Sequence, residues 1–170
     1  FKETGLLAGV AVASDGRARA GMGTDFGDYD GDGRLDLVVT NFELETHNLF
    51  RNLGDGLFAD VTATTGLNVA TLAYLGFGAV FLDYDNDHDV DMFIAKCRGA
   101  NSLAAVDQMH RNNGDGTFTE VAASLNLAET PGAFPYHQSW SSAWGDYDND
   151  GDMDVLIGAS SFTGGGHKLL

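Results

Sequence analysis

The sequence predicts an all-β protein made of β-propeller blades, each with four antiparallel strands. Three observations favour this class. An aspartate-rich segment occurs three times, an apolar stretch lies on each side of every copy, and an Asp-Gly motif recurs after the first two copies. The copies begin at Asp28, Asp83 and Asp146, so the spacing is 55 residues (28 to 83) and then 63 residues (83 to 146). Four-stranded units with a period of roughly 40 to 60 residues are typical of propeller blades.

Each aspartate-rich segment is expected to join the first two strands of a blade. The stretches before it, 21–27, 76–82 and 139–145, combine apolar with small residues, and those after it, 35–40, 90–95 and 153–158, are rich in β-formers. Glycine and serine in the first stretch suit an inner strand, where neighbouring blades approach closely. We therefore call the segments 28–36, 83–91 and 146–154 the first, second and third aspartate loops.

The rest of the repeat is predicted to be a β-hairpin. The segments 49–52 and 58–61 flank Gly54-Asp55-Gly56, and 109–112 and 118–121 flank Gly114-Asp115-Gly116 in the same way. Asp-Gly between β-rich segments is a strong tight-turn signal. Each hairpin supplies the third and fourth strands of its blade.

The whole chain, 1–170, is expected to be one propeller segment, which these boundaries divide into blades. We expect the end of a preceding blade in 1–20 with a hairpin around Asp15-Gly16, complete blades in 21–75 and 76–138, and a partial blade in 139–170. Because the chain begins at Phe1 without a signal peptide, a processed or partial chain is expected. An open arc of blades leaves strand edges unpaired, so the remaining propeller blades or further copies of the chain are expected partners.

The aspartate loops predict about three calcium sites. Each has aspartates at positions 1, 3, 5 and 9, and carboxylates at this spacing repel one another unless a hard cation lies among them. With the backbone carbonyl of position 7, each loop offers five or more oxygen ligands. The expected ligands are Asp28, Asp30, Asp32, Arg34 and Asp36; Asp83, Asp85, Asp87, Asp89 and Asp91; and Asp146, Asp148, Asp150, Asp152 and Asp154, where Arg34, Asp89 and Asp152 act through the backbone carbonyl.

Other metal motifs fit the loops less well. An EF-hand needs an acid at position 12, and that position holds Val39, Ile94 and Ile157. Magnesium prefers a stricter octahedron, and zinc ligands are missing from the loops apart from His88. The alternative is that the loops are solvated acidic turns that bind no ion. The identical spacing in three copies argues against this alternative.

Position 6 of the loops predicts a residue with positive φ. Gly33 and Gly151 fit this requirement, whereas the second loop carries His88, so the second site is expected to be strained or of lower affinity. A ligand role for His88 remains the less favoured alternative.

Composition limits the classes of partner. The formal net charge is −16, and 14 of the 25 acidic residues belong to the aspartate loops. No cluster of lysine and arginine exists to neutralise phosphates, which argues against a nucleic-acid partner. No apolar run of about 18 residues is present, so no membrane span is predicted. The single cysteine, Cys97, is interpreted as a buried structural thiol.

These motifs resemble FG-GAP/VCBS repeats, as in integrin α-chain propellers, and are most similar to bacterial relatives of cartilage acidic protein that carry ASPIC/UnbV domains. The resemblance lies in Gly21-Met22-Gly23, the segment 28–37, Thr40-Asn41, Arg51-Asn52, Gly54-Asp55-Gly56, Asp60-Val61-Thr62 and Gly66-Leu67. It implies a seven- or eight-bladed propeller with calcium between the first two strands of a blade, in a secreted or cell-surface protein. His88, the insertions at 98–107 and 125–138, and the lack of an ASPIC/UnbV segment depart from the pattern.

The sequence favours a calcium-binding extracellular module with a structural, adhesion or ligand-binding role, whose partner is a protein or a glycan. The first alternative is a propeller enzyme, a polysaccharide lyase or hydrolase with structural calcium, although no common catalytic motif is present. The second is a subunit of a self-assembling surface array. Candidate enzymatic or binding side chains outside the loops are His47, His110, Phe134, Tyr136, His137 and Trp140, with core packing as the alternative for Trp140 and Trp144.

Overall fold

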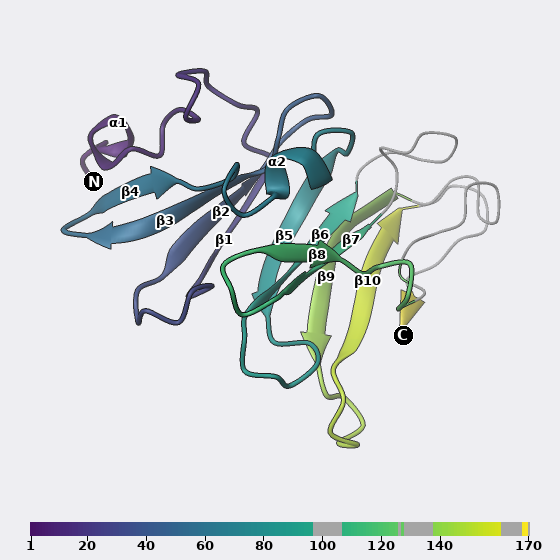
Figure 1. Cartoon of the computed structure of the whole chain (residues 1–170). Coiled ribbons are helices and arrows are strands. Elements are labelled where there is room, and N and C mark those ends of the chain that lie inside the picture. Colours follow the sequence, from purple (N-terminus) through teal and green to yellow (C-terminus); the bar gives the residue numbers. More distant parts are fainter. Residues whose placement is uncertain (97–106, 126, 128–137, 161–167, 170) are drawn as a thin grey trace.

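The computed structural model describes residues 1–96, 107–125, 127, 138–160 and 168–169. Within them, three antiparallel β-sheets follow one another along the chain and stand side by side (Figure 1). We call them blades A, B and C. The expected all-β fold of propeller blades is confirmed.

Neighbouring strands in the sequence are neighbours in each sheet. Blade A contains β1 (Gly23–Gly27), β2 (Asp36–Thr40), β3 (Asn48–Gly54) and β4 (Leu57–Asp60). Blade B contains β5 (Gly76–Leu82), β6 (Asp91–Lys96), β7 (Gln108–Asn112) and β8 (Phe118–Glu120). Blade C contains β9 (Gln138–Gly145), β10 (Asp154–Ser160) and β11 (Lys168–Leu169) in the described part of the chain. The first strands of blades B and C thus begin at residues 76 and 138, beside the expected boundaries at 76 and 139.

The first strands of the blades lie next to one another. β5 lies against β1 and β2 of blade A, and β9 lies against β5 and β6 of blade B. A Cβ atom on Gly23 would come within 1.7 Å of the Phe77 carbonyl oxygen, and one on Gly27 within 2.6 Å of the Phe81 ring. The small residues of β1 therefore permit the close approach that the sequence pattern indicates.

Two apolar layers hold the blades together. Val38, Leu49, Met92 and Ile94 belong to the layer between blades A and B, and other buried side chains form the layer between blades B and C. In the second layer the Phe93 and Trp144 rings meet edge to face, with centroids 5.2 Å apart. Burial in such layers is the main stabilising contribution, at roughly 25 cal/mol per Å² of apolar surface. Core packing is therefore the role of Trp144.

The amino-terminal segment differs from the expected hairpin. The turn is present, since the Gly16 amide donates to the Ala13 carbonyl at 2.8 Å, but the described residues before Gly23 form no strand. They contain the single-turn helix α1 (Gly5–Ala8) and lie on blade A, where the Ser14 amide donates to Asp60 Oδ2 at 2.7 Å. An isolated two-stranded hairpin is only marginally stable, so packing on an existing sheet decides the local structure.

The second helix, α2 (Leu67–Ala70), lies in the connection between blades A and B. Both helices have four residues, and no helix in the described ranges is long and apolar enough to cross a membrane. Cys97, Phe134, Tyr136 and His137 lie outside the described residues, as do most of the two predicted insertions, 98–107 and 125–138, and the side chain of Trp140 is not described either.

Candidate metal site in the aspartate loops

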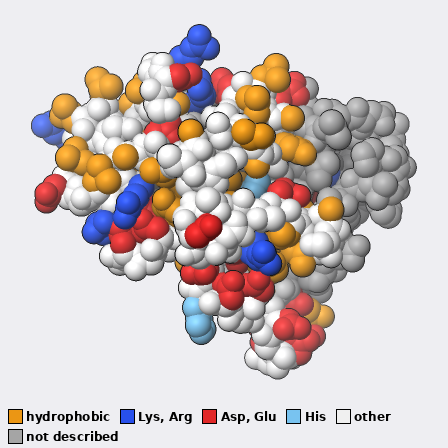
Figure 2. All heavy atoms as spheres, in the orientation of Figure 1, with side chains coloured by type: hydrophobic (Ala, Val, Ile, Leu, Met, Phe, Trp, Pro, Cys, Tyr) orange, Lys and Arg blue, Asp and Glu red, His pale blue; other side chains and the backbone are white. Residues whose placement is uncertain are grey.

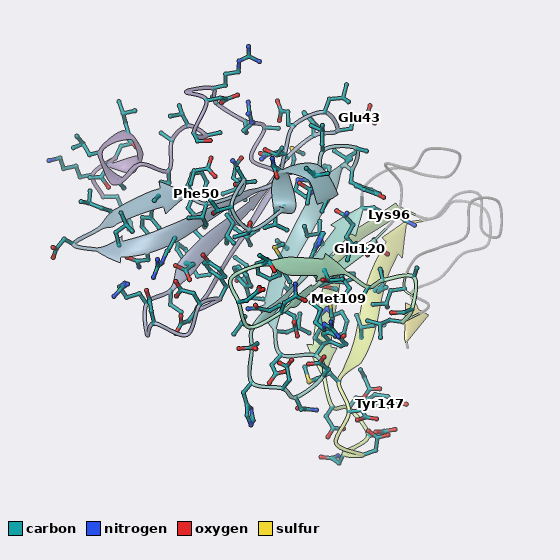
Figure 3. All side chains as sticks on the ribbon, viewed as in Figure 1. Glu43, Phe50, Lys96, Met109, Glu120 and Tyr147 are labelled. Carbon is teal, nitrogen blue, oxygen red and sulfur yellow. The ribbon has the colours of Figure 1, made fainter. Side chains whose placement is uncertain are left out.

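All three aspartate loops connect the first and second strands of a blade and lie at the same end of the sheets, the lower edge in Figure 1. Figure 2 shows acidic side chains gathered along this edge. Tyr147, labelled in Figure 3, marks the third loop at the end of the β9–β10 hairpin. The repeat in the sequence therefore becomes a repeat in space, with one loop for each blade.

The backbone of each loop turns through two residues in the left-handed region. The expected positive φ at position 6 is confirmed by Gly33 (84°), His88 (74°) and Gly151 (97°). Position 4 has positive φ as well: 68° at Gly31, 60° at Asn86 and 62° at Asn149. Sequence reasoning missed this second turn residue, although the signal was present, because glycine and asparagine are the residues that enter this region most readily.

The carboxylate at position 1 anchors the turn. Asp28 accepts hydrogen bonds from the amides of Asp32 (3.0 Å) and Gly33 (2.8 Å). Equivalent pairs of bonds reach Asp83 from the amides of residues 87 and 88, and Asp146 from those of residues 150 and 151. Position 5 accepts from the amide of position 7 in all three loops. The three loops thus share one hydrogen-bond pattern.

The carboxylate at position 9 closes the loop from the start of the second strand. Asp36 accepts from the Tyr29 amide at 3.2 Å, and Asp91 accepts from the Tyr84 amide at 3.1 Å. A second bond comes from the third strand of the same blade, where the Asn52 amide donates to Asp36 and the Asn112 amide donates to Asp91. Asp36 and Asp91 are fully buried, whereas Asp154 of the third loop is half-buried.

Carboxylate oxygens converge in every loop. One oxygen from each of three aspartates lies within 4.8 Å of the others in each group, and the groups are Asp28, Asp30 and Asp32; Asp83, Asp85 and Asp91; and Asp146, Asp148 and Asp154. The other predicted side-chain ligands, Asp36, Asp87 and Asp150, lie in the same loops outside these groups. The carbonyls of Arg34, Asp89 and Asp152 remain predicted ligands.

This donor set fits a hard cation. It consists of carboxylate oxygens, which are among the ligands that calcium prefers. The burial and like charge of the groups raise the pKa of several of them. Burial raises the pKa of Asp36, and it raises that of Asp91 to about 6, with Asp85 and Asp87 adding to the effect. In the third loop, desolvation and the charges of Asp150 and Asp154 raise the pKa of Asp148.

Arginine side chains contact the first loop, which sequence reasoning did not foresee. Arg51 on β3 forms ion pairs with Asp30 (Nε to Oδ2, 2.6 Å) and Asp32 (one terminal nitrogen to Oδ2, 3.2 Å), and Arg34 also pairs with Asp32. Arg111 takes the place of Arg51 in blade B, and its side chain is exposed. The first loop therefore carries positive charge beside its carboxylates.

The histidines considered as catalytic candidates lie in the core. His47 and His110 are fully buried, and burial lowers their pKa values to about 4 and about 3. His47 Nδ1 accepts a hydrogen bond from the Asn41 amide at 3.0 Å, so it holds the end of β2 in place. Core packing is the role that the structure gives both residues.

Comparisons with known proteins agree with the fold and the loops. The chain aligns with cartilage acidic protein 1 of Xenopus tropicalis at 28% identity over 179 residues, which cover 99% of this chain and 24% of that protein. The chain thus spans about a quarter of the length of this relative. The family model described as FG-GAP-like repeat matches residues 28–94 and 83–157, and both matches begin at position 1 of an aspartate loop. The chain belongs to the FG-GAP-like repeat family.

Proposed function

We propose that this chain is a calcium-binding segment of an extracellular β-propeller, in which each aspartate loop holds one Ca²⁺ and the ions stabilise the blades. The observation that carries the proposal is the convergence of three carboxylate oxygens within 4.8 Å in each of three equivalent loops. In loop one the converging ligand side chains would be Asp28, Asp30 and Asp32, at positions 1, 3 and 5. In loops two and three they would come from positions 1, 3 and 9, which are Asp83, Asp85 and Asp91, and Asp146, Asp148 and Asp154.

Electrostatics supports the proposal. Two unit charges 4 Å apart repel by about 1 kcal/mol in water and by more where water is excluded. Each loop places three carboxylates at such distances, and Asp91 is fully buried. A divalent cation converts this repulsion into attraction, and an ion that binds only the folded state stabilises it by mass action.

The same chemistry supports an extracellular location. Modules of extracellular proteins bind calcium with dissociation constants of about 10⁻⁴ to 10⁻³ M, a range that suits exposed loops rich in carboxylates. The relative is named for cartilage and for its acidity, and this chain has a net charge of −16. We propose secretion or display at the cell surface, with a structural, adhesion or ligand-binding role towards a protein or glycan.

Further blades are the proposed neighbours within the propeller. Tyr29 of blade A packs against Phe118 of blade B, with ring centroids 6.0 Å apart. Tyr147, the equivalent residue of blade C, is exposed and lines a cavity of about 370 Å³ together with Leu156. A fourth blade of the same repeat type, from this polypeptide or from another copy, would fill this face as blade B fills that of blade A.

Titration calorimetry on the metal-stripped chain tests calcium binding. We expect about three calcium ions per chain, a higher melting temperature with calcium, and a much smaller effect of magnesium. Asp83→Ala should remove one binding event, whereas Asp55→Asn, in the exposed β3–β4 turn, should leave the stoichiometry unchanged. A metal-free chain that takes up no calcium and melts at the same temperature with and without it would overturn the proposal.

A further inference from the structure

Asn112, at the end of β7, reaches from blade B into the aspartate loop of blade A. We propose that Asn112 couples the first and second loops, so that calcium bound in one raises the calcium affinity of the other. This inference rests on the proposed calcium binding and adds to it a route by which neighbouring sites communicate.

The route consists of hydrogen bonds between buried groups. Asn112 Nδ2 donates to the carbonyl oxygen of Tyr29 in the first loop at 2.7 Å and to that of Val90 in the second loop at 3.1 Å. The backbone amide of the same residue donates to Asp91 Oδ1 at 2.8 Å. Asn112 is only 2% exposed, so water does not compete for these bonds.

The two ends of the route are the closing carboxylates of the two loops. The Tyr29 amide donates to Asp36 Oδ2, and the Asn112 amide donates to Asp91 Oδ1. Position 9 of the first loop is therefore connected to position 9 of the second loop through two residues only, Tyr29 and Asn112. The Tyr29 ring, which packs against Phe118 of blade B, adds an apolar contact beside the hydrogen bonds.

Asn52 provides an internal comparison, because it occupies the equivalent position in blade A. Its amide donates to Asp36 at 2.7 Å, and its Nδ2 donates to the Leu35 carbonyl at 2.9 Å, as the corresponding atoms of Asn112 do in blade B. Both side chains also accept a bond from the glycine two residues later. Of these two asparagines, only Asn112 donates to a loop of another blade.

Coupling follows because an ion that orders one loop also fixes the backbone groups that orient the other. Once the first ion has ordered its loop, which includes Tyr29, the side chain of Asn112 and hence Asp91 lose less conformational freedom when the second ion binds. The link between the second and third loops is weaker. Among the described residues it consists of a 3.3 Å hydrogen bond from Asn86 Nδ2 to the Gly151 carbonyl, and both residues are exposed. We therefore expect strong coupling between loops one and two and little between loops two and three.

Calcium titrations followed residue by residue by NMR test the inference on the whole chain. The amides of Gly33, His88 and Gly151 report on the first, second and third loops, because each donates to the position 1 carboxylate of its own loop. Asp30→Ala disables the first loop without removing a backbone hydrogen bond, since one Asp30 oxygen has no partner and the other pairs with Arg51. We expect this change to lower the calcium affinity of the second loop about fivefold or more and to leave the third loop unchanged.

The same titrations in an Asn112→Ala background identify the carrier of the coupling. There we expect Asp30→Ala to leave the affinity of the second loop unchanged, whereas in the matched Asn52→Ala background the fivefold loss should persist. Should Asn112→Ala fail to fold, Asn112→Ser, whose shorter side chain does not reach Tyr29, replaces it, with Asn52→Ser as its control.

Each result has one meaning. An unchanged second-loop affinity in the Asp30→Ala chain overturns the coupling, and an equal loss with and without Asn112 overturns the role of this residue. In both cases calcium binding itself would stand. Absence of any calcium-dependent shift in the unmodified chain would instead overturn the proposed function, and the coupling with it.

Discussion

Arg51 Nε lies 2.6 Å from Asp30 Oδ2, so a guanidinium from the third strand of blade A occupies the edge of the first aspartate loop. The hydrogen bond to Asp32 and, second to it, the charge of Asp30 raise the pKa of Arg51, so the guanidinium keeps its positive charge. Blade B has no such ion pair among its described residues, where the exposed Arg111 takes the place of Arg51. The first and second loops, alike in their aspartates, therefore differ in local charge.

The first prediction concerns this charge. Arg51→Gln should raise the calcium affinity of the first loop about fivefold, because it removes a cation whose repulsion of calcium amounts to about 1 kcal/mol. The metal-free chain should at the same time lose a little stability. Arg111→Gln is the matched control and should change the second loop less. Calorimetric titration measures both, and an unchanged affinity in Arg51→Gln would show that the arginine does not compete with calcium.

The second prediction concerns the left-handed turn of the second loop. His88 has φ of 74°, and its side chain is 94% exposed, so it contributes little packing. His88→Gly should stabilise the chain by about 1 kcal/mol, because glycine adopts this conformation without a steric penalty. Gly33→Ala should destabilise it by a similar amount, since nothing lies within 4 Å of the added Cβ and only the backbone conformation is affected. Urea denaturation measures both changes in unfolding free energy. Two changes of the same sign would contradict the prediction.

The third prediction concerns the close approach of blades A and B. Gly27→Ala should destabilise the chain by about 2–3 kcal/mol, because the added methyl would lie 2.6 Å from the Phe81 ring. Gly145 is the equivalent residue of blade C, and a methyl there would meet nothing within 4 Å. Gly145→Ala should therefore change stability by less than about 0.5 kcal/mol. Equal effects of the two substitutions in thermal unfolding would contradict the close approach.

The fourth prediction concerns acid sensitivity. Burial lowers the pKa of His47 to about 4 from an ordinary value of 6.5. Between these two values the unfolded chain binds a proton that the folded chain excludes, so stability falls as the pH falls from 6.5 towards 4. The loss at this residue amounts to about 3 kcal/mol.

His47→Asn isolates this contribution. In blade A, His47 accepts a hydrogen bond from the Asn41 amide. At the equivalent place in blade B, Asp107 accepts one from the Lys96 amide, so a short side chain with an oxygen acceptor suits the position. The difference in unfolding free energy between His47→Asn and the unmodified chain should shift in favour of the variant as the pH falls from 7 to 4.5. A difference that is independent of pH would contradict the prediction.

Much of the fold could be predicted because its signals are local. The aspartate repeat placed the loops between strands, the Asp-Gly motif placed the β3–β4 turn, and glycine at position 6 predicted the positive φ that His88 shares. The roles of Arg51 and Asn112 could not be predicted, because their partners are distant in sequence. The hydrogen bond from Asn112 to Tyr29 joins residues 83 positions apart, and no local preference of either residue encodes it. The path of residues 1–20 was missed for the same reason, since it depends on contacts with Asp60.

Glycine in β1 and large side chains farther along give the boundary between blades A and B the form of a wedge. Gly23 and Gly27 bring blade A against Phe77 and Phe81, whereas Tyr29 and Phe118 fill the space farther along the same boundary. The taper of this wedge sets the angle between blades A and B. Residue size at two positions of β1 is therefore a determinant of this angle, and larger residues there would reduce the taper.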